Sequence, residues 1–318
     1  MKRAAVMLMS IALLAGCGGG DDEAEKSAEG RTKLVVGVIP IADVAPLYLG
    51  IEKGFFRDER LDVEPQPIQG GAAAVPSVMA NEFQIAFGNS ISLLQAQQRN
   101  LQLRIVTEGV QGGKSDKDST NGMMVPKGSD VREASDLEGK TIAVNTLDNL
   151  GEVTVKSSLE SQGADVSDLK FVEVPFPEMN TALGRDGVAA AWHVEPFISQ
   201  LTAEGGRKLF DPFVETHPRL TPAQYFGSAK FLDKNPEVEE SFRRAMNKSL
   251  DYAQTHEAEV RKLIPEYSEI PAPVAEKIPL PYWTSDLNED SVRELATLAE
   301  KYGVLEGEVD VDAILPKQ

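Results

Sequence analysis

The sequence predicts an α/β protein of two lobes, each with a mainly parallel sheet flanked by helices, and a ligand cleft between them. The chain has 318 residues, which is too long for one small core and suits about two domains. Short apolar runs rich in β-branched residues alternate with helical patterns over most of its length, as in proteins with parallel sheets. Hydrophobic residues make up 42% of the chain, which is typical of a globular protein.

The first predicted unit spans residues 34–63. The apolar run at 34–39 predicts a buried strand, and a helix should follow with Asp43 as its N-cap and Gly54 as its left-handed C-cap. A second strand begins near residue 61. The loop between the first strand and the helix lies at the carboxyl end of that strand, where ligands bind in open α/β sheets.

The same pattern continues through the first lobe. Gly70 and Gly71 precede a predicted helix, where they either let a ligand approach the backbone closely or only form a sharp turn. Asn89 and Ser90 follow a buried strand and can offer hydrogen bonds to a ligand, or Ser90 simply caps the next helix. The expected elements are helix 72–80, strand 85–87, helix 91–99 and strand 103–106.

The second lobe repeats this alternation of strands and helices after a polar crossover loop. Thr146, Asn149 and Gly151 lie in a strand-to-helix loop, where the first two could bind ligand or merely cap the helix. Trp192, His193 and Glu195 belong to a loop that follows the last strand. The expected elements are strands 122–125, 142–144, 169–174 and 188–191, with helices 152–162 and 177–183.

The chain is expected to return to the first lobe near residues 224–228, so that two segments, near Gly122 and Tyr225, join the lobes. Prolines then separate helices at 236–255, 258–264 and 289–302, which should pack on the first lobe. The expected division is a signal peptide (1–16), a lipidated cysteine with a flexible tether (17–32), lobe 1 (33–121), lobe 2 (122–224), and the return to lobe 1 with C-terminal helices (225–318).

Three stretches carry a family resemblance. Residues 45–56 (APLYLGIEKGFF), 136–144 (DLEGKTIAV) and 188–197 (VAAAWHVEPF) resemble extracytoplasmic solute-binding proteins of ABC importers, in the branch that handles nitrate, sulfonates, taurine and thiamine-precursor pyrimidines. Gly187 departs from the family pattern, which has an acidic residue there. The resemblance implies a type II periplasmic-binding-protein-like fold, hinge closure on a small solute, and delivery to a permease and an ATPase.

The N-terminal residues are predicted to form an export signal. Lys2 and Arg3 precede a short apolar run that is too short to span a bilayer as a mature helix. The run ends in Leu-Ala-Gly-Cys17, which resembles the lipobox of bacterial lipoproteins and implies cleavage before Cys17 and lipidation of its thiol. The alternative is an ordinary signal peptide. Residues 18–32 are polar, and we expect a tether of roughly 20 Å that holds the body outside the cytoplasmic membrane.

Composition excludes several other roles. A net charge of −18 would repel nucleic-acid phosphates, so no nucleic-acid partner is expected. The single cysteine allows no intrachain disulfide, and three scattered histidines show no metal-ligand spacing, so neither a metal site nor a cofactor is expected. No pattern of nucleophile, base and orienting residue is present, although Ser90–His193 or His193–Glu195 is conceivable as a pair. A monomer is expected.

The loops expected at the cleft contain no Lys or Arg, and His193 is the one candidate cation among them. A buried di-anion would lack a counter-charge, which favours a neutral, zwitterionic or heteroaromatic solute such as a pyrimidine. Tyr48 and Trp192 would stack on such a ring or belong to the core. Alternatives are a sulfonate or nitrate ligand, an exported enzyme and a sensory role. The candidate ligand-binding residues are Asp43, Tyr48, Gly70, Gly71, Asn89, Ser90, Thr146, Asn149, Gly151, Trp192, His193 and Glu195.

Overall fold

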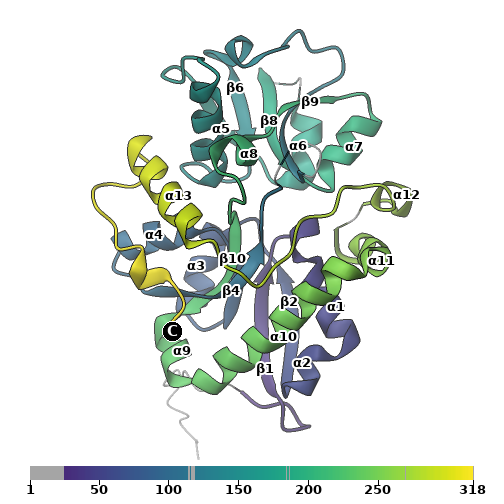
Figure 1. Cartoon of the computed structure of the whole chain (residues 1–318), viewed down its shortest axis with the longest axis vertical. Helices are drawn as coiled ribbons and strands as arrows, with labels where there is room; N and C mark the ends of the chain where they lie inside the picture. The colour runs from purple at the N-terminus through teal and green to yellow at the C-terminus, as the bar shows by residue number, and fades with distance from the viewer. Residues whose placement is uncertain are drawn as a thin grey trace, which may run out of the picture.

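The protein folds into two lobes, each organised around its own five-stranded sheet (Figure 1). The structure is a computed structural model that describes residues 25–113, 115, 119–183, 185, 187–268 and 270–317. The expected signal peptide and Cys17 lie outside these residues. In the part of the chain that is described, no helix has both the length and the apolar character needed to cross a membrane.

The sheet of the first lobe has the order β2-β1-β3-β10-β4. β1 pairs in parallel with β2 and β3, whereas β10 pairs antiparallel with β3 and β4. Four strands therefore run in one direction and β10 runs in the other. The strands are β1 (Thr32–Val38), β2 (Leu61–Pro67), β3 (Ile85–Gly88), β4 (Leu103–Val110) and β10 (Ala223–Ser228).

The sheet of the second lobe has the order β7-β6-β8-β5-β9 and repeats this arrangement. β6 pairs in parallel with β7 and β8, and β5 pairs antiparallel with β8 and β9. The strands are β5 (Asn121–Val125), β6 (Thr141–Val144), β7 (Lys170–Glu173), β8 (Val188–Val194) and β9 (Arg207–Phe210).

The reversed strands β5 and β10 are also where the chain enters and leaves the second lobe. β4 of the first sheet is followed by β5 of the second, and β9 of the second is followed by β10 of the first. Both reversed strands are buried along their full length. Two crossing segments therefore join the lobes, which is the connectivity of a hinged pair.

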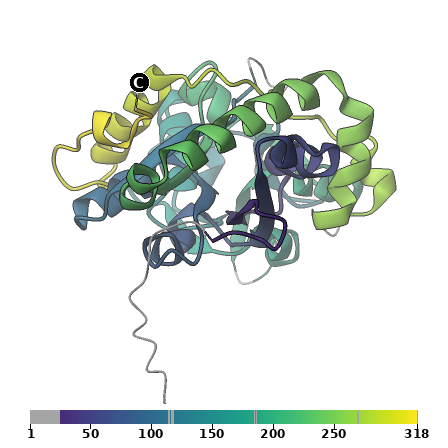
Figure 2. The ribbon, with the colours of Figure 1, turned by 90° about the horizontal axis from the view of Figure 1, so that it is seen from below.

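Helices cover both sheets. Those of the first lobe and its return are α1 (Ala45–Lys53), α2 (Phe55–Asp58), α3 (Gly71–Met79), α4 (Ser90–Gln98), α9 (Ala229–Lys234), α10 (Pro236–Thr255), α11 (Glu257–Ser268), α12 (Ala272–Ala275) and α13 (Glu289–Lys301), with 3₁₀ turns η1 (Ala42–Val44) and η3 (Asp312–Ile314). Those of the second lobe are α5 (Leu150–Ser161), α6 (Phe176–Ala182), α7 (Phe197–Ala203) and α8 (Pro212–Thr216), with η2 (Ala134–Leu137). The long helix α10 packs on α1, α2 and β4 across the first lobe (Figure 2).

Several local expectations need correction. Asp43 is not an N-cap, because it lies inside η1 and its side chain makes no capping hydrogen bond to η1 or α1. Asn89, not Ser90, caps α4, since its Oδ1 accepts from the Ser92 N–H. Trp192 and His193 belong to β8 itself rather than to the loop after it. Gly54 does adopt the expected left-handed conformation, with φ of 80°.

The segment before β1 is folded onto the first lobe. Residues 25–31, which the sequence assigns to a flexible tether, form a turn in which Lys26 pairs with Thr32 as an antiparallel bridge. The Lys33 N–H donates to the Glu25 carbonyl at 2.8 Å. Residues 25–31 therefore contact the amino-terminal end of β1, at the end of the sheet opposite the carboxyl ends of its parallel strands.

Candidate functional site

The two lobes touch each other at the carboxyl ends of their parallel strands. Asn89 Nδ2 of the first lobe donates to Asn149 Oδ1 of the second at 2.8 Å, and Gln95 Nε2 donates to the Asp148 carbonyl at 2.7 Å. Beside them, the Ala42 N–H donates to the Glu195 carbonyl at 3.0 Å. These bonds show a closed arrangement in which Asn89 and Asn149 bind each other across the cleft.

A groove of about 230 Å³ lies between the lobes. It is mostly apolar and takes its walls from the loops after β1 and β2 on one side and from α6 and α7 on the other. This volume suits a small solute, since pockets for drug-sized ligands start at roughly 300 Å³. The residues that line it, none of them Lys or Arg, are Ile39, Pro40, Ile41, Pro67, Ile68, Gln69, Pro175, Phe176, Pro177 and Phe197.

Some of the buried polar atoms that have no hydrogen-bond partner lie close to the residues that line this groove. Asp43 is two residues from Ile41, and Trp192 and His193 pack on Phe176. Buried polar groups in proteins are normally paired, so each such atom calls for a partner. Both lobes contribute, and we call these six residues the unpaired polar set. Its members and their atoms, none of which has a partner among the described residues, are Asp43 Oδ1, Ser90 Oγ, Trp192 Nε1, His193 Nδ1 and Nε2, Gln224 Oε1 and Tyr225 OH.

Asp43 is held by its backbone while its carboxylate stays unpaired. Trp283 Nε1 donates to the Asp43 carbonyl at 3.0 Å, and the Tyr267 hydroxyl donates to the neighbouring Ile41 carbonyl at 3.1 Å. The side chain is 7% exposed. Burial away from water raises the pKa of Asp43 to about 7, because nothing nearby compensates the charged form.

Three tyrosines surround this carboxyl group. The rings of Tyr48 and Tyr267 are stacked with their centroids 4.2 Å apart, and Tyr225 lies on the crossing strand β10. Burial raises the pKa of each hydroxyl, and the charge of Asp43 raises those of Tyr225 and Tyr267 further. Tyr48 thus packs against a protein ring, on the side of the site where Asp43 lies.

His193 is a neutral imidazole rather than a cation. Its ring is fully buried between Phe176 and Phe197, with centroids at 5.8 and 5.6 Å. Burial lowers the pKa of His193 to about 3, so the side chain is uncharged at pH 7. The expectation that it supplies a positive charge is therefore wrong, and it offers one N–H donor and one nitrogen acceptor instead.

Glu195 follows β8 and is satisfied by the first turn of α7. Its carboxylate accepts from the Ser199 N–H at 3.1 Å and from the Ser199 hydroxyl at 2.9 Å. Burial raises the pKa of Glu195 to about 7, while the Ser199 bonds and the charge of Lys208 lower it. Lys208 itself pairs with Asp211 at 3.0 Å.

The candidate glycines allow close packing around the cleft. A methyl group on Gly71 would lie 2.7 Å from Cα of Gly88, so α3 starts directly against the end of β3. A methyl group on Gly151 would lie 2.8 Å from the Trp192 indole. At Gly70 it would lie 2.9 Å from Oγ1 of Thr146, which places these two residues face to face across the lobes.

Sequence reasoning missed several residues of this region. Gln224 and Tyr225 come from β10, and Tyr267 and Trp283 come from the C-terminal part of the chain. Phe176 and Phe197 lie at helix starts in the second lobe. The sequence did predict that the chain returns to the first lobe near residues 224–228. A strand at that point lies beside the hinge, so its polar side chains Gln224 and Tyr225 could have been added to the candidate site.

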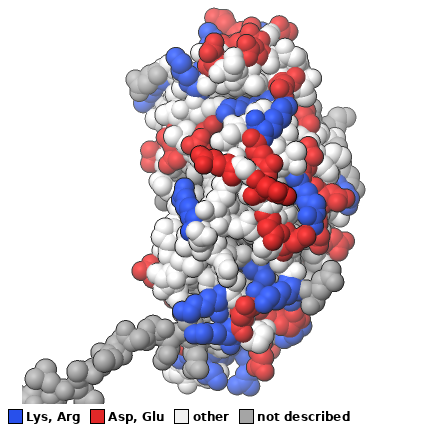
Figure 3. Space-filling model, turned by 90° about the vertical axis from the view of Figure 1, so that its left-hand side faces the viewer, with Lys and Arg blue, Asp and Glu red and all other residues white. Residues whose placement is uncertain are grey.

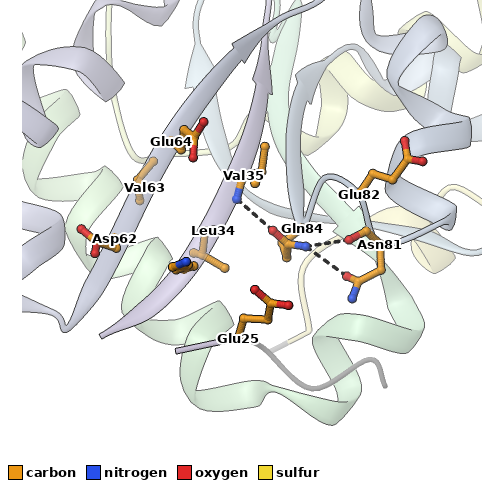
Figure 4. Close-up of a pocket in the computed structure, with 10 residues that line it drawn as sticks. Glu25, Leu34, Val35, Asp62, Val63, Glu64, Asn81, Glu82 and Gln84 are labelled. Carbon is orange, nitrogen blue, oxygen red and sulfur yellow. Dashed lines mark hydrogen bonds between the residues drawn. The ribbon is translucent and has the colours of Figure 1, made fainter. Parts of the chain in front are cut away.

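A second cavity of about 540 Å³ lies at the other end of the first sheet (Figure 4). Its central side chain, Gln84, is already bonded to the protein: Oε1 accepts from the Val35 N–H at 2.8 Å, and Nε2 donates to the Asn81 carbonyl at 2.7 Å. Glu25, Asp62 and other charged side chains line its solvent-facing rim. This cavity involves one lobe only and contains no member of the unpaired polar set.

The outer surface is of mixed charge. On the face shown in Figure 3, acidic side chains form a band across the middle while basic side chains gather near the bottom. No group of three or more His, Cys, Asp or Glu that could hold a metal ion occurs in the described part of the chain.

Comparison with known proteins places this geometry among solute-binding proteins. The family model described as NMT1/THI5 like matches residues 41–260, which is more than half of the chain. A relative in Bacillus subtilis (strain 168), named as an aliphatic sulfonates-binding protein, is 23% identical over 326 residues, covering 99% of this chain and 95% of that protein.

Solved structures share the fold. The alkanesulfonate-binding protein SsuA from Xanthomonas axonopodis pv. citri, bound to MOPS, superposes with a TM-score of 0.74 at 19% identity, covering 92% of this chain and 99% of that one. The periplasmic nitrate-binding protein NrtA from Synechocystis PCC 6803 superposes with a TM-score of 0.76 at 15% identity, covering 90% and 86%. At these identities the likeness concerns the fold alone.

Proposed function

The chain belongs to the NMT1/THI5-like family, and from this premise we propose that it is the solute-binding component of an ABC import system. It would capture a small organic solute between its lobes and deliver it to a permease and ATPase pair. The names of its relatives support this role, since the Bacillus subtilis protein is named for binding sulfonates and NrtA for binding nitrate.

The observation that carries this proposal is the unpaired polar set beside the interlobe groove. Its members come from both lobes: Asp43, Ser90, Gln224 and Tyr225 from the first, Trp192 and His193 from the second. A solute that bonds residues of both lobes is held most tightly when the lobes are closed, so binding shifts the hinge equilibrium toward closure.

The chemistry of the site favours a neutral or zwitterionic solute, for example a pyrimidine-like ring. The groove walls are apolar and aromatic, and no Lys or Arg lines them. A ring could stack against the flat apolar walls while its polar edge bonds the unpaired polar set. The alternative is a sulfonate, taurine or nitrate ligand, which the names of the relatives favour.

The proposal includes release of the solute unchanged. Among the described residues, the Ser90 hydroxyl and the His193 ring have no hydrogen-bond partner, and the Glu195 carboxylate binds Ser199. The Ser90–His193 and His193–Glu195 pairs that an enzyme would use are therefore not formed in this part of the chain. The competing hypothesis is an exported enzyme that uses the same cleft. Recovery of intact solute after prolonged incubation supports binding alone, and appearance of a product would establish the enzyme.

We also propose that Cys17 is lipidated and tethers a monomeric protein outside the cytoplasmic membrane. This rests on the sequence before Cys17, which lies outside the described residues. Expression of the Cys17→Ser variant should shift the protein from the membrane fraction to the soluble extracytoplasmic fraction. An unchanged distribution would reject lipid anchoring.

A thermal-shift screen of the mature protein against sulfonates, nitrate, pyrimidines and aromatic acids tests the binding role. A ligand at one hundred times its Kd stabilises the folded state by about 2.7 kcal/mol, which raises Tm by roughly 4 °C for a protein of this size. Failure of every class to raise Tm would contradict the proposed function.

His193→Ala should weaken binding of the best ligand from that screen by about tenfold, because one buried polar partner is removed. Isothermal titration calorimetry measures the affinity, and circular dichroism verifies the fold. His256→Ala is the matched control, since His256 stacks on Tyr252 outside the cleft. Equal affinity of the two variants would remove His193 from the site.

A further inference from the structure

We infer that Asp43 selects solutes that carry a protonated nitrogen, with the ammonium or amidinium group placed against its carboxylate. The inference deepens the proposed function and rests on it, because it names the charge class of the solute held in the same cleft.

The first step is that the Asp43 side chain has no structural task in the described fold. It caps neither η1 nor α1, and its Oδ1 accepts no hydrogen bond. Its position is set by Trp283, which is buried and donates to the Asp43 carbonyl, and by Tyr267, which is half-buried and donates to the Ile41 carbonyl. These contacts fix the backbone at Asp43, whereas its Oδ1 makes no hydrogen bond within the described fold.

The second step is that no positively charged side chain of the described residues acts on Asp43. The titratable groups that face it are the hydroxyls of Tyr48 on α1, Tyr225 on β10 and Tyr267 on α11. Across the cleft, His193 is neutral and Glu195 is a second carboxyl group. Burial alone shifts the pKa of Asp43, with no charged neighbour contributing. A buried carboxylate is costly unless paired, and the solute is the remaining source of a counter-charge.

The third step is that the surroundings suit a cation and disfavour an oxyanion. Tyrosine rings present negative faces that attract an ammonium group. A sulfonate in this position would meet the Asp43 carboxyl group, and it would find no Lys or Arg among the residues that line the groove. The apolar walls formed by Ile41, Phe176 and Phe197 would contact the uncharged part of the solute.

The test uses matched probes that differ in charge on one skeleton. The two-carbon set is 2-aminoethanol, taurine, ethanesulfonate and ethylene glycol, and the aromatic set is benzylamine, benzyl alcohol and phenylmethanesulfonate. On the skeleton that binds, the cationic or zwitterionic member should bind at least tenfold tighter than the anionic member. Calorimetry on the mature protein measures both affinities.

The Asp43→Asn variant keeps the shape of the side chain and removes its charge. It should weaken binding of the amine-bearing probe at least tenfold and leave the neutral probe within about threefold of wild type. Asp251→Asn is the matched control, because Asp251 is an exposed aspartate of the same lobe. Wild-type affinity should also rise with pH between about 5 and 8, where a primary amine stays protonated, and Asp43→Asn should lose that dependence.

The outcomes separate the inference from the proposed function. Tightest binding of an anionic probe, or unchanged amine affinity in Asp43→Asn, overturns the inference and leaves the solute-binding role standing. Failure of every probe to bind a correctly folded protein overturns the inference, and the wider thermal-shift screen then decides the role. Amine-selective binding that Asp43→Asn abolishes supports both.

Discussion

Burial changes the acid–base chemistry of Asp43, Glu195 and His193, the three titratable side chains nearest the groove. Burial raises the pKa of both carboxyl groups to about 7 and lowers that of the imidazole to about 3. In each case the charged form is disfavoured because burial removes the side chain from water. The free protein therefore holds these groups largely neutral near pH 6, which makes its stability depend on pH.

The Asp43 contribution to that dependence can be isolated. An unfolded aspartate loses its proton near pH 3.9, whereas folded Asp43 does so near pH 7, so between these values the folded state binds more protons. The free energy of unfolding should therefore fall as pH rises from about 4 to about 7, by up to about 4 kcal/mol from this residue. Asp43→Asn lacks the effect, so its stability relative to wild type should increase over that range.

Urea unfolding at several pH values measures this difference. The opposite effect of His193 is present in both proteins and cancels. Asp251→Asn, at an exposed position of the same lobe, is the control variant. A pH-independent difference for Asp43→Asn would show that the carboxyl group of Asp43 is solvated.

At the residue scale, sequence reasoning located side chains near the cleft better than it assigned their roles. Asp43, Trp192 and His193 all belong to the unpaired polar set. Asp43 was expected to cap a helix, but it lies inside η1. His193 was expected to carry charge, but Phe176 and Phe197 bury its ring. Both outcomes depend on the local backbone path and on residues distant in sequence, which local patterns do not describe.

At the element scale, the contact between α3 and β3 depends on two glycines. Gly71 and Gly88 meet so closely that a methyl group on either would lie within 2.7 Å of the other residue's Cα. Backbone cannot move aside as a flexible side chain can, so α3 would have to shift. This contact sets the position of the loop that carries Gly70 toward the second lobe.

Gly71→Ala should therefore destabilise the protein by about 1–3 kcal/mol, as overpacking of a core does. Thermal and urea unfolding measure the change. Gly112→Ala is the control, because its nearest neighbour would be 3.4 Å away and its backbone needs no positive φ. Equal stability of the two variants would mean that α3 is free to move from β3.

The order of strands and helices was predictable through β8, because apolar runs alternate with helical periodicity. The second-lobe elements α7, β9 and α8 were not predicted. The antiparallel pairing of β5 and β10 was not predictable, since it follows from how the lobes are joined and has no local pattern. α13 packs on α4 of the first lobe, as expected of the C-terminal helices. It also contacts α5 of the second lobe, and Lys301 and Tyr302 bond Glu160 there.

At the scale of the whole molecule, function depends on the balance between open and closed lobes. Gln95 Nε2 donates to the Asp148 carbonyl, and Gln95 Oε1 accepts from Asn149 Nδ2 at 3.2 Å. These bonds form only when the lobes meet. Because neither is fully buried, the two bonds together contribute about 1 kcal/mol, so the loss of both changes the open-to-closed ratio roughly fivefold.

Gln95→Ala should therefore populate the open form, increase the radius of gyration of the ligand-free protein in small-angle X-ray scattering, and weaken solute binding by up to roughly fivefold. Gln98→Ala, also on α4, is the control. Its side chain donates to the Glu306 carbonyl without reaching the second lobe. Identical scattering from both variants would show that the Gln95 bonds do not hold the lobes together.

The most direct measurement is a crystal structure of the mature protein with the solute that raises Tm most. The account predicts that the solute lies between the lobes, against Ile41 and Phe176, within hydrogen-bond distance of members of the unpaired polar set. A solute seated beside Gln84 in the first lobe, or anywhere that only one lobe contacts, would contradict it.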